Sequence, residues 1–108
     1  SRDLLAHATA MGEVVRERLA ALADDVGHVA DVRGRGLMVG AEFVDRAGDP
    51  APDLVDEVRL ACLRRGVVTW GGGRRGNVLR LMPPLVVTRA QVDTAMDLVG
   101  DAVRATCA

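Results

Sequence analysis

Arginine dominates the chemistry that this sequence could perform. All 14 of its Lys and Arg residues are arginines, so none of the 108 residues is a lysine. A chain without lysine cannot form a lysine Schiff base, and it lacks the lysine of a GxxxxGK phosphate-binding loop. Guanidinium groups instead bind carboxylates and phosphates through pairs of parallel hydrogen bonds. The residue types therefore exclude lysine-based covalent catalysis, and they leave guanidinium groups as the cations that could bind an anion.

The arginines concentrate in a stretch without acids. Residues 58–92 contain seven arginines and no Asp or Glu, a local charge of +7, whereas the remainder of the chain sums to −8. Four of these side chains are expected on a solvated surface: Arg59, Arg64, Arg65 and Arg89. Arg80 differs because it lies inside the apolar run VLRLM, where a half-buried guanidinium without an anion costs several kcal/mol. Either a distant carboxylate pairs with Arg80, or Arg80 is held for a ligand anion.

A glycine-rich loop directly precedes this run. The segment from Gly71 to Gly76 reads GGGRRG, and its glycines allow the positive φ angles and close backbone approach that anion-binding loops require. The same composition is also typical of a flexible linker. The residues alone leave both interpretations open.

No other side chains form a recognisable catalytic group. His7 and His28 have no acid or cysteine at metal-ligand spacing. Cys62 and Cys107 have no neighbouring histidine and no CxxC partner, and Ser1 is the only serine. We therefore predict no metal site and no catalytic nucleophile or base in this chain.

Composition narrows the partners and the compartment. The net charge of −1 and the presence of only two aromatic residues argue against nucleic-acid binding. No apolar run approaches the roughly 20 residues that span a bilayer, so we expect no membrane partner. Two cysteines in a chain with ample apolar residues favour a reducing cytoplasm over a disulfide scaffold.

Hydrophobic periodicity predicts the first half of the fold. An apolar stripe indicates a helix that ends near Gly27, made by Leu4, Ala8, Met11, Val15, Leu19 and Leu22. Residues 29–44 read as two strands that meet at Gly34-Arg35-Gly36, and alternation places four side chains on one face: Leu37, Val39, Ala41 and Phe43. Residues 45–52 form a loop rich in Gly, Asp and Pro.

The second half repeats the helix and strand pattern. Asp53 is expected to cap a short helix that ends at Gly66 and carries Leu54, Val58, Ala61 and Cys62. A strand over 67–69, a loop over 70–77 and a strand over 78–82 follow. Thr88 and Gln91 form a capping box for a final helix with an apolar stripe of Val92, Ala95, Met96, Val99, Ala102 and Val103.

This order, α-β-β-α-β-β-α, predicts the α+β fold class. We expect residues 1–108 to form a single domain, in which a small, mostly antiparallel sheet carries the helices on one face. A helical pattern begins at once at Ser1, where no initiator methionine stands, so we expect the domain to be a fragment of a longer chain.

Three segments together resemble a known family. The runs VRGRGLMVGAEFVD, LVDEV with ACLRRGVV, and GNVLRLMPPLVVT, which is followed by a capped terminal helix, are similar to the C-terminal small domain of class-III aminotransferases. These are pyridoxal-phosphate enzymes of fold type I. The resemblance covers essentially the whole chain, and GNVLRLMPPL is most similar to the 4-aminobutyrate and related ω-amino-acid transaminases.

The resemblance implies a function for Arg80. The family's arginine that binds the substrate carboxylate falls on Arg80, and the loop before it would line the active-site entrance with Trp70, Gly72, Gly73, Arg74, Arg75, Gly76 and Asn77. The family transfers an amino group from an ω-amino acid to a 2-oxo acid, with the cofactor as electron sink. Its Schiff-base lysine and most contacts to pyridoxal 5'-phosphate belong to a large domain. We thus expect this chain alone to be inert, and the parent enzyme to be a homodimer.

Two other functions compete with this interpretation. One is a free-standing α+β module that binds a small anion, or is regulated by one, at Arg80 and the glycine loop. The other is a pure interaction domain, which would leave Arg80 paired with an internal carboxylate.

Overall fold

The described part of the chain forms three helices and four strands in the predicted order. The computed structural model describes residues 2–35, 38–84 and 87–107. Its elements are α1 (Arg2–Asp25), β1 (Val29–Arg35), β2 (Met38–Phe43), α2 (Pro52–Arg64), β3 (Trp70–Gly72), β4 (Val78–Leu81) and α3 (Arg89–Thr106). The α+β class is confirmed.

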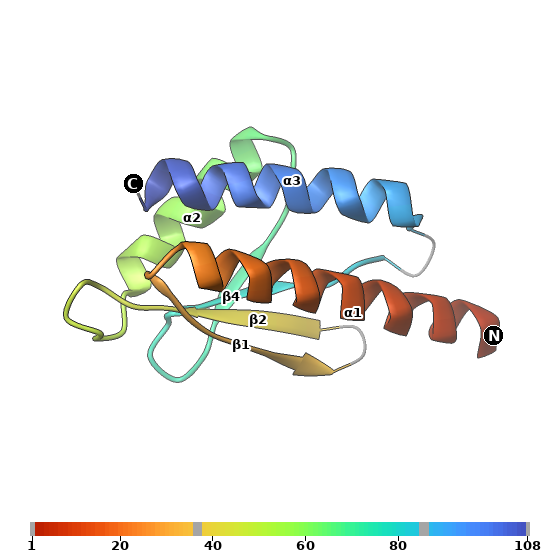
Figure 1. Ribbon diagram of the computed structural model, residues 1–108, viewed down its shortest axis with the longest axis horizontal. Coiled ribbons are helices and arrows are strands. Elements are labelled where there is room, and N and C mark those ends of the chain that lie inside the picture. Colours follow the sequence, from red (N-terminus) through yellow and green to blue (C-terminus); the bar gives the residue numbers. More distant parts are fainter. Residues whose placement is uncertain (1, 36–37, 85–86, 108) are drawn as a thin grey trace.

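The strands make one antiparallel sheet in the order β1-β2-β4-β3. β4 therefore lies between β2 and the short edge strand β3, although the loop of residues 44–51 and helix α2 separate β2 from β3 along the chain. Figure 1 shows α1 and α3 side by side above the sheet, with α2 behind them at one end. The helices thus cover one face of the sheet, as predicted, and leave the other face open.

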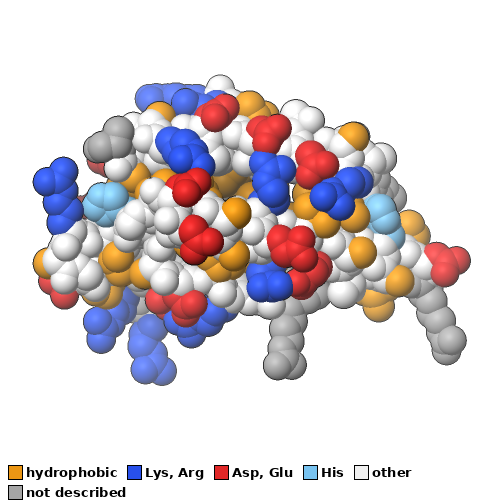
Figure 2. All heavy atoms as spheres, viewed as in Figure 1, with side chains coloured by type: hydrophobic (Ala, Val, Ile, Leu, Met, Phe, Trp, Pro, Cys, Tyr) orange, Lys and Arg blue, Asp and Glu red, His pale blue; other side chains and the backbone are white. Residues whose placement is uncertain are grey.

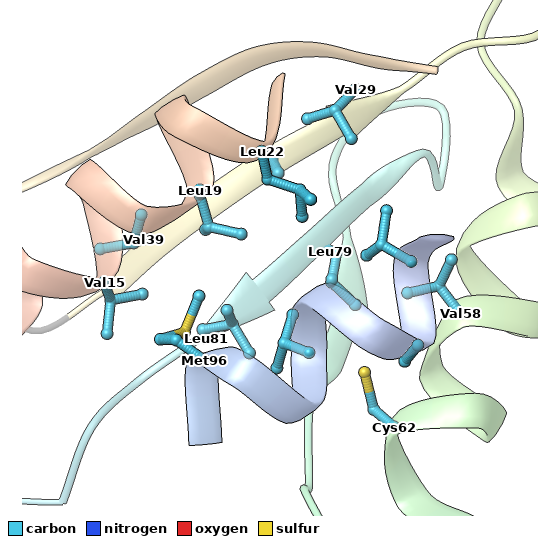
Figure 3. Close-up of a cluster of buried hydrophobic side chains, with 14 of the residues drawn as sticks. Val15, Leu19, Leu22, Val29, Val39, Val58, Cys62, Leu79, Leu81 and Met96 are labelled. Carbon is cyan, nitrogen blue, oxygen red and sulfur yellow. The ribbon is translucent and has the colours of Figure 1, made fainter. Parts of the chain in front are cut away.

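The hydrophobic core lies between the helices and the covered face. Side chains from α1, α3 and α2 meet those of β2 and β4 there, as Leu19, Leu79, Val39 and Met96 do in Figure 3. Phe43 is the largest fully buried side chain, and Val39 and Ala41 on the same face of β2 are buried with it. This confirms the predicted alternation for three of its four members, since Leu37 and Gly36 lie outside the described residues.

The ends of two helices test the capping predictions. α3 has the predicted capping box, in which the Thr88 Oγ1 accepts from the Gln91 backbone N–H at 3.1 Å and the Gln91 side chain accepts from the Thr88 N–H at 2.9 Å. The prediction for α2 was wrong. Pro52 is already helical, so Ala51 is the N-cap without a side-chain cap, and Asp53 lies in the first turn. Gly66 has a φ of +83° just beyond the C-terminus, where a left-handed residue is favoured.

The third strand is also shifted relative to the prediction. Residues 67–69 belong to no strand, and β3 instead begins at Trp70 and uses the first two glycines of the expected loop. Pairing with β4 determines this position, because Trp70 stands opposite Arg80 and Gly72 opposite Val78. The glycine-rich segment is therefore half strand and half turn.

Candidate functional site

The open face of the sheet carries a cleft. It has a volume of about 710 Å³. Its lining comes from β1, β2, β4 and the two loops at one end of the sheet: Arg33, Gly34, Met38, Gly40, Glu42, Val44, Gly48, Pro50, Gly73, Arg74, Arg75, Asn77, Val78 and Arg80. Five of the predicted site residues are in this set, so the fold brings them together.

Arg80 projects into this cleft from β4, one of the two central strands of the sheet. The side chains of Leu79 and Leu81 point into the core, and Arg80 between them is exposed on the opposite face. The expectation of a half-buried guanidinium was therefore wrong, because strand alternation turns Arg80 away from its apolar neighbours. Its partner on β2 is Gly40, and the space that a side chain of Gly40 would fill is taken up by the Val78 side chain.

Within the described residues, the Arg80 guanidinium has neither an ion pair nor a hydrogen-bonded partner. Asp93, the nearest acid in the sequence, lies on α3 and pairs with Arg89 and Arg18 instead. Glu42 is the only acid among the described lining residues, and it pairs with Arg33, which also contacts Asp31 at 2.8 Å. The single carboxylate of the cleft is thus already neutralised.

The surface charges on the helix side of the molecule differ from those on the sheet side. On the helix side, acids and arginines alternate and form ion pairs such as Arg18–Asp97 and Arg104–Asp25. In Figure 2 further arginine side chains project from the lower side of the molecule, where Figure 1 draws the sheet. Arg74 and Arg75 line the cleft without an ion pair to any described acid. Together with Arg80 they give the cleft a positive charge that attracts anions.

A short ordered turn holds the two loop arginines beside β4. Gly73 and Gly76 have φ angles of +86° and +69°, and the Gly76 N–H donates to the Gly73 carbonyl at 3.2 Å. Side chains other than glycine rarely adopt such angles, so these two glycines determine the path of the turn. The segment between β3 and β4 therefore follows a defined turn.

Asn77 anchors the end of this turn. It is 7% exposed, and its side-chain Nδ2 donates to the Phe43 carbonyl at 3.1 Å. The backbone N–H of Phe43 donates in turn to the Asn77 carbonyl at 2.8 Å. These contacts fix the turn against the end of β2. Asn77 therefore holds the cleft wall in place.

Three predicted entrance residues lie apart from the cleft lining. Trp70 is 43% exposed and lines an apolar cavity of about 290 Å³ between β4, α1 and α3. Gly76 lies in the turn, and Gly72 lies under the Arg80 guanidinium. Sequence reasoning missed Arg33 and Glu42, since only the antiparallel pairing of β1 with β2 brings them to the cleft.

Comparison with known proteins places this chain in a family. Residues 1–103 match the model of the family described as aminotransferase class-III. The chain belongs to the class-III aminotransferases. This membership confirms the resemblance of the GNVLRLMPPL segment and of the two segments before it.

Individual relatives are similar over most of the chain. An alanine/serine racemase of Pyrococcus horikoshii is 33% identical over 96% of this chain and 22% of its own length. A 4-aminobutyrate aminotransferase of Mycobacterium leprae is 32% identical over 88% of this chain and 22% of its own. A solved phospholyase from Arthrobacter, in complex with phosphoethanolamine, superposes with a TM-score of 0.87 at 34% identity, over 95% of this chain and 25% of that one. The chain therefore spans about a quarter or less of the proteins it matches.

The cofactor of class-III aminotransferases does not fit the residues of this chain. Covalent attachment of pyridoxal phosphate needs a lysine, and the sequence has none. The cleft residues offer guanidinium groups for an anion but no amine for a carbonyl carbon.

Other chemistry is sparse in the described part of the chain. No group of three or more His, Cys, Asp or Glu residues there is arranged to hold a metal ion. Cys62 and Cys107 are free thiols, and burial raises the pKa of each above its ordinary value. Neither is activated as a nucleophile. None of the described helices could cross a membrane.

Proposed function

We propose that this chain is the substrate-binding small domain of a pyridoxal-phosphate-dependent aminotransferase, in which Arg80 binds the substrate carboxylate. The observation that carries the proposal is a guanidinium without an ion pair to any described residue, exposed in a cleft where the one acid among the described lining residues already pairs with Arg33. A cation in this setting has its hydrogen-bonding edge available for a ligand.

The substrates we propose are an ω-amino acid such as 4-aminobutyrate, as amino donor, and a 2-oxo acid. Arg80 orients the donor's carboxylate, so that the distant carbon with the amino group points away from the sheet. Arg74 and Arg75 add positive charge, which raises the local concentration of the anionic substrate. Residues outside this chain supply the lysine and the cofactor site, and the cofactor when bound acts as electron sink.

The remaining partners follow from this proposal. We infer that the large domain of the same protein covers the open face of the sheet, and that the complete cytoplasmic enzyme is a homodimer. The 108-residue chain on its own has no transaminase activity. An independent anion-binding module is the second candidate, and the same cleft is its only support.

Substrate kinetics of the complete enzyme test the proposal. Arg80→Ala should raise the KM for 4-aminobutyrate about 10- to 100-fold, the value of a charge-assisted hydrogen-bonded pair. The KM for butylamine, which has no carboxylate, should stay within about twofold of its original value. Arg80→Lys should restore only part of the affinity, because an ammonium group cannot form the bidentate pair.

Arg64→Ala is the matched control, because Arg64 is an exposed arginine on α2, outside the cleft lining. It should change neither KM. Equal increases for 4-aminobutyrate and butylamine in Arg80→Ala would return Arg80 to a structural role. Transaminase activity of the isolated chain would refute the proposal that residues outside this chain supply the lysine and the cofactor site.

A further inference from the structure

The Arg80 guanidinium lies directly on the backbone of the neighbouring strand at Gly72. A Cβ atom built on Gly72 would lie 2.5 Å from the Arg80 Cζ, 2.6 Å from its Nη1 and 2.9 Å from its Nε. The central carbon is the nearest of the three atoms. The strand therefore meets the flat face of the guanidinium and leaves its N–H edge free.

We propose that Gly72 is a positioning residue for Arg80: its missing side chain forms a seat that holds the guanidinium flat against β3. This inference rests on the proposed function, since it says how the carboxylate-binding group is oriented. A guanidinium binds a carboxylate in its own plane, through two parallel N–H bonds. Fixing that plane by its face fixes the direction from which the carboxylate is bound.

The other glycine beside Arg80 has a different role. A Cβ on Gly40 would first meet the Val78 Cγ1 at 3.0 Å, and it would reach only the aliphatic Cγ of Arg80, at 3.9 Å. Gly40 thus provides space for side chains on β4. Of these two glycines, only Gly72 lies against the charged end of Arg80.

Gly71 provides a matched control in the same strand. A Cβ there points to the opposite side of the sheet and meets the Arg59 guanidinium of α2, with 3.1 Å to Nη1. Neither Gly71 nor Gly72 has a positive φ, so alanine fits the backbone at both positions. Both substitutions bring a methyl group to the far end of a flexible arginine, and only one of these arginines is Arg80.

The size of the displacement follows from the contacts. Ordinary contact with a Cβ begins at 3.4 Å, so alanine at position 72 must push the Arg80 Cζ away by ~1 Å. The strand and the core are untouched by this movement, because the atoms involved are exposed and the backbone is compatible. We therefore expect an effect on ligand binding without an effect on folding.

The test measures butyrate binding to the 108-residue chain by NMR, through the Nε–H resonance of Arg80. Arg80→Ala identifies this resonance by its loss, and the remaining backbone shifts follow binding in that variant. Gly72→Ala should shift the Arg80 resonance in the free protein and weaken butyrate binding about tenfold. Gly71→Ala should change neither the Arg80 resonance nor the butyrate affinity beyond experimental error. The urea midpoints of the unsubstituted chain, Gly72→Ala and Gly71→Ala should agree.

The outcomes separate the two claims. Butyrate binding that survives Arg80→Ala refutes the proposed function, and the seat with it. Binding that is lost in Arg80→Ala but equal in Gly72→Ala and Gly71→Ala overturns the seat alone, as does tighter binding in Gly72→Ala. In an Arg80→Ala background, Gly72→Ala should cause no further loss, because its effect acts only through Arg80.

Discussion

The hydrogen bond of Asn77 offers the sharpest test of how the cleft wall is held. Asn77 is buried at the end of the turn that carries Arg74 and Arg75, and its Nδ2 donates to the Phe43 carbonyl. The same carbonyl also accepts the Ala51 N–H at 3.0 Å. Removing the side-chain donor thus leaves no orphaned acceptor.

Two substitutions at Asn77 therefore differ in a predictable way. Asn77→Ala loses one hydrogen bond and should lower the free energy of unfolding by about 1 kcal/mol. Asn77→Asp keeps the shape but places a carboxylate against the Phe43 carbonyl, in a site that is 7% exposed. A buried charge facing an acceptor costs more, so we expect a loss of about 3 kcal/mol at pH 7.

The pH dependence distinguishes charge from shape. Burial and the facing carbonyl should raise the pKa of the introduced carboxyl in the folded state above its unfolded value of about 3.9. The penalty should therefore be small below about pH 4, where the protonated carboxyl can donate to the carbonyl, and should grow as the pH rises.

Urea denaturation, followed by circular dichroism at pH 4 and pH 7, measures this penalty as the difference from the unsubstituted chain. The slope against urea should be unchanged, since the surface exposed on unfolding is the same. Equal losses for Asn77→Ala and Asn77→Asp at both pH values would refute this account of the turn.

Four further predictions concern the core, the cap of α3 and the two thiols. Phe43→Ala empties the centre of the core at a side chain only 1% exposed, and should cost about 4 kcal/mol in urea denaturation; a loss below 1 kcal/mol would contradict the assigned core. Thr88→Ala removes the cap of α3 and should lower stability by about 1 kcal/mol and Tm by about 5 °C, whereas Thr94→Ala on the same helix should change little. Because burial raises the pKa of Cys62 and Cys107, both thiols should react slowly with a disulfide reagent at pH 8. Cys107 should react before Cys62 in the folded chain, and the two thiols should react at equal rates in urea. The raised pKa values also imply a pH dependence of stability. The free energy of unfolding should be constant with respect to thiol ionisation below about pH 9 and should fall above it, and Cys62→Ala should reduce the slope of this fall.

Sequence patterns correctly predicted the features that depend only on residues close together in the chain. The capping box of Thr88 and Gln91 needs only residues three apart, and it is present in the structure. The buried face of β2 follows from a period of two over Val39, Ala41 and Phe43. Strict alternation applied to β4 would also have turned Arg80 outward, because its neighbours Leu79 and Leu81 both point into the core.

Features that depend on pairing between distant segments could not be predicted in this way. Residues 67–69 have the β-branched side chains of a strand, but the hydrogen bonds of β4 go to Trp70, Gly71 and Gly72. The ion pair of Arg33 with Glu42 requires the register of β1 on β2. Both the wall of the cleft and the neutralisation of its acid come from this sheet geometry, which no single stretch of sequence contains.

The central claim is that Arg80 binds the substrate carboxylate, and a crystal structure of the complete enzyme with 4-aminobutyrate bound tests it most directly. The measured quantity is the distance from the Arg80 guanidinium nitrogens to the carboxylate oxygens of the ligand. We predict two such distances of about 2.7–2.9 Å, in one plane, with Glu42 still paired to Arg33. A carboxylate bound elsewhere, with Arg80 paired to an acid of the large domain, would contradict the account.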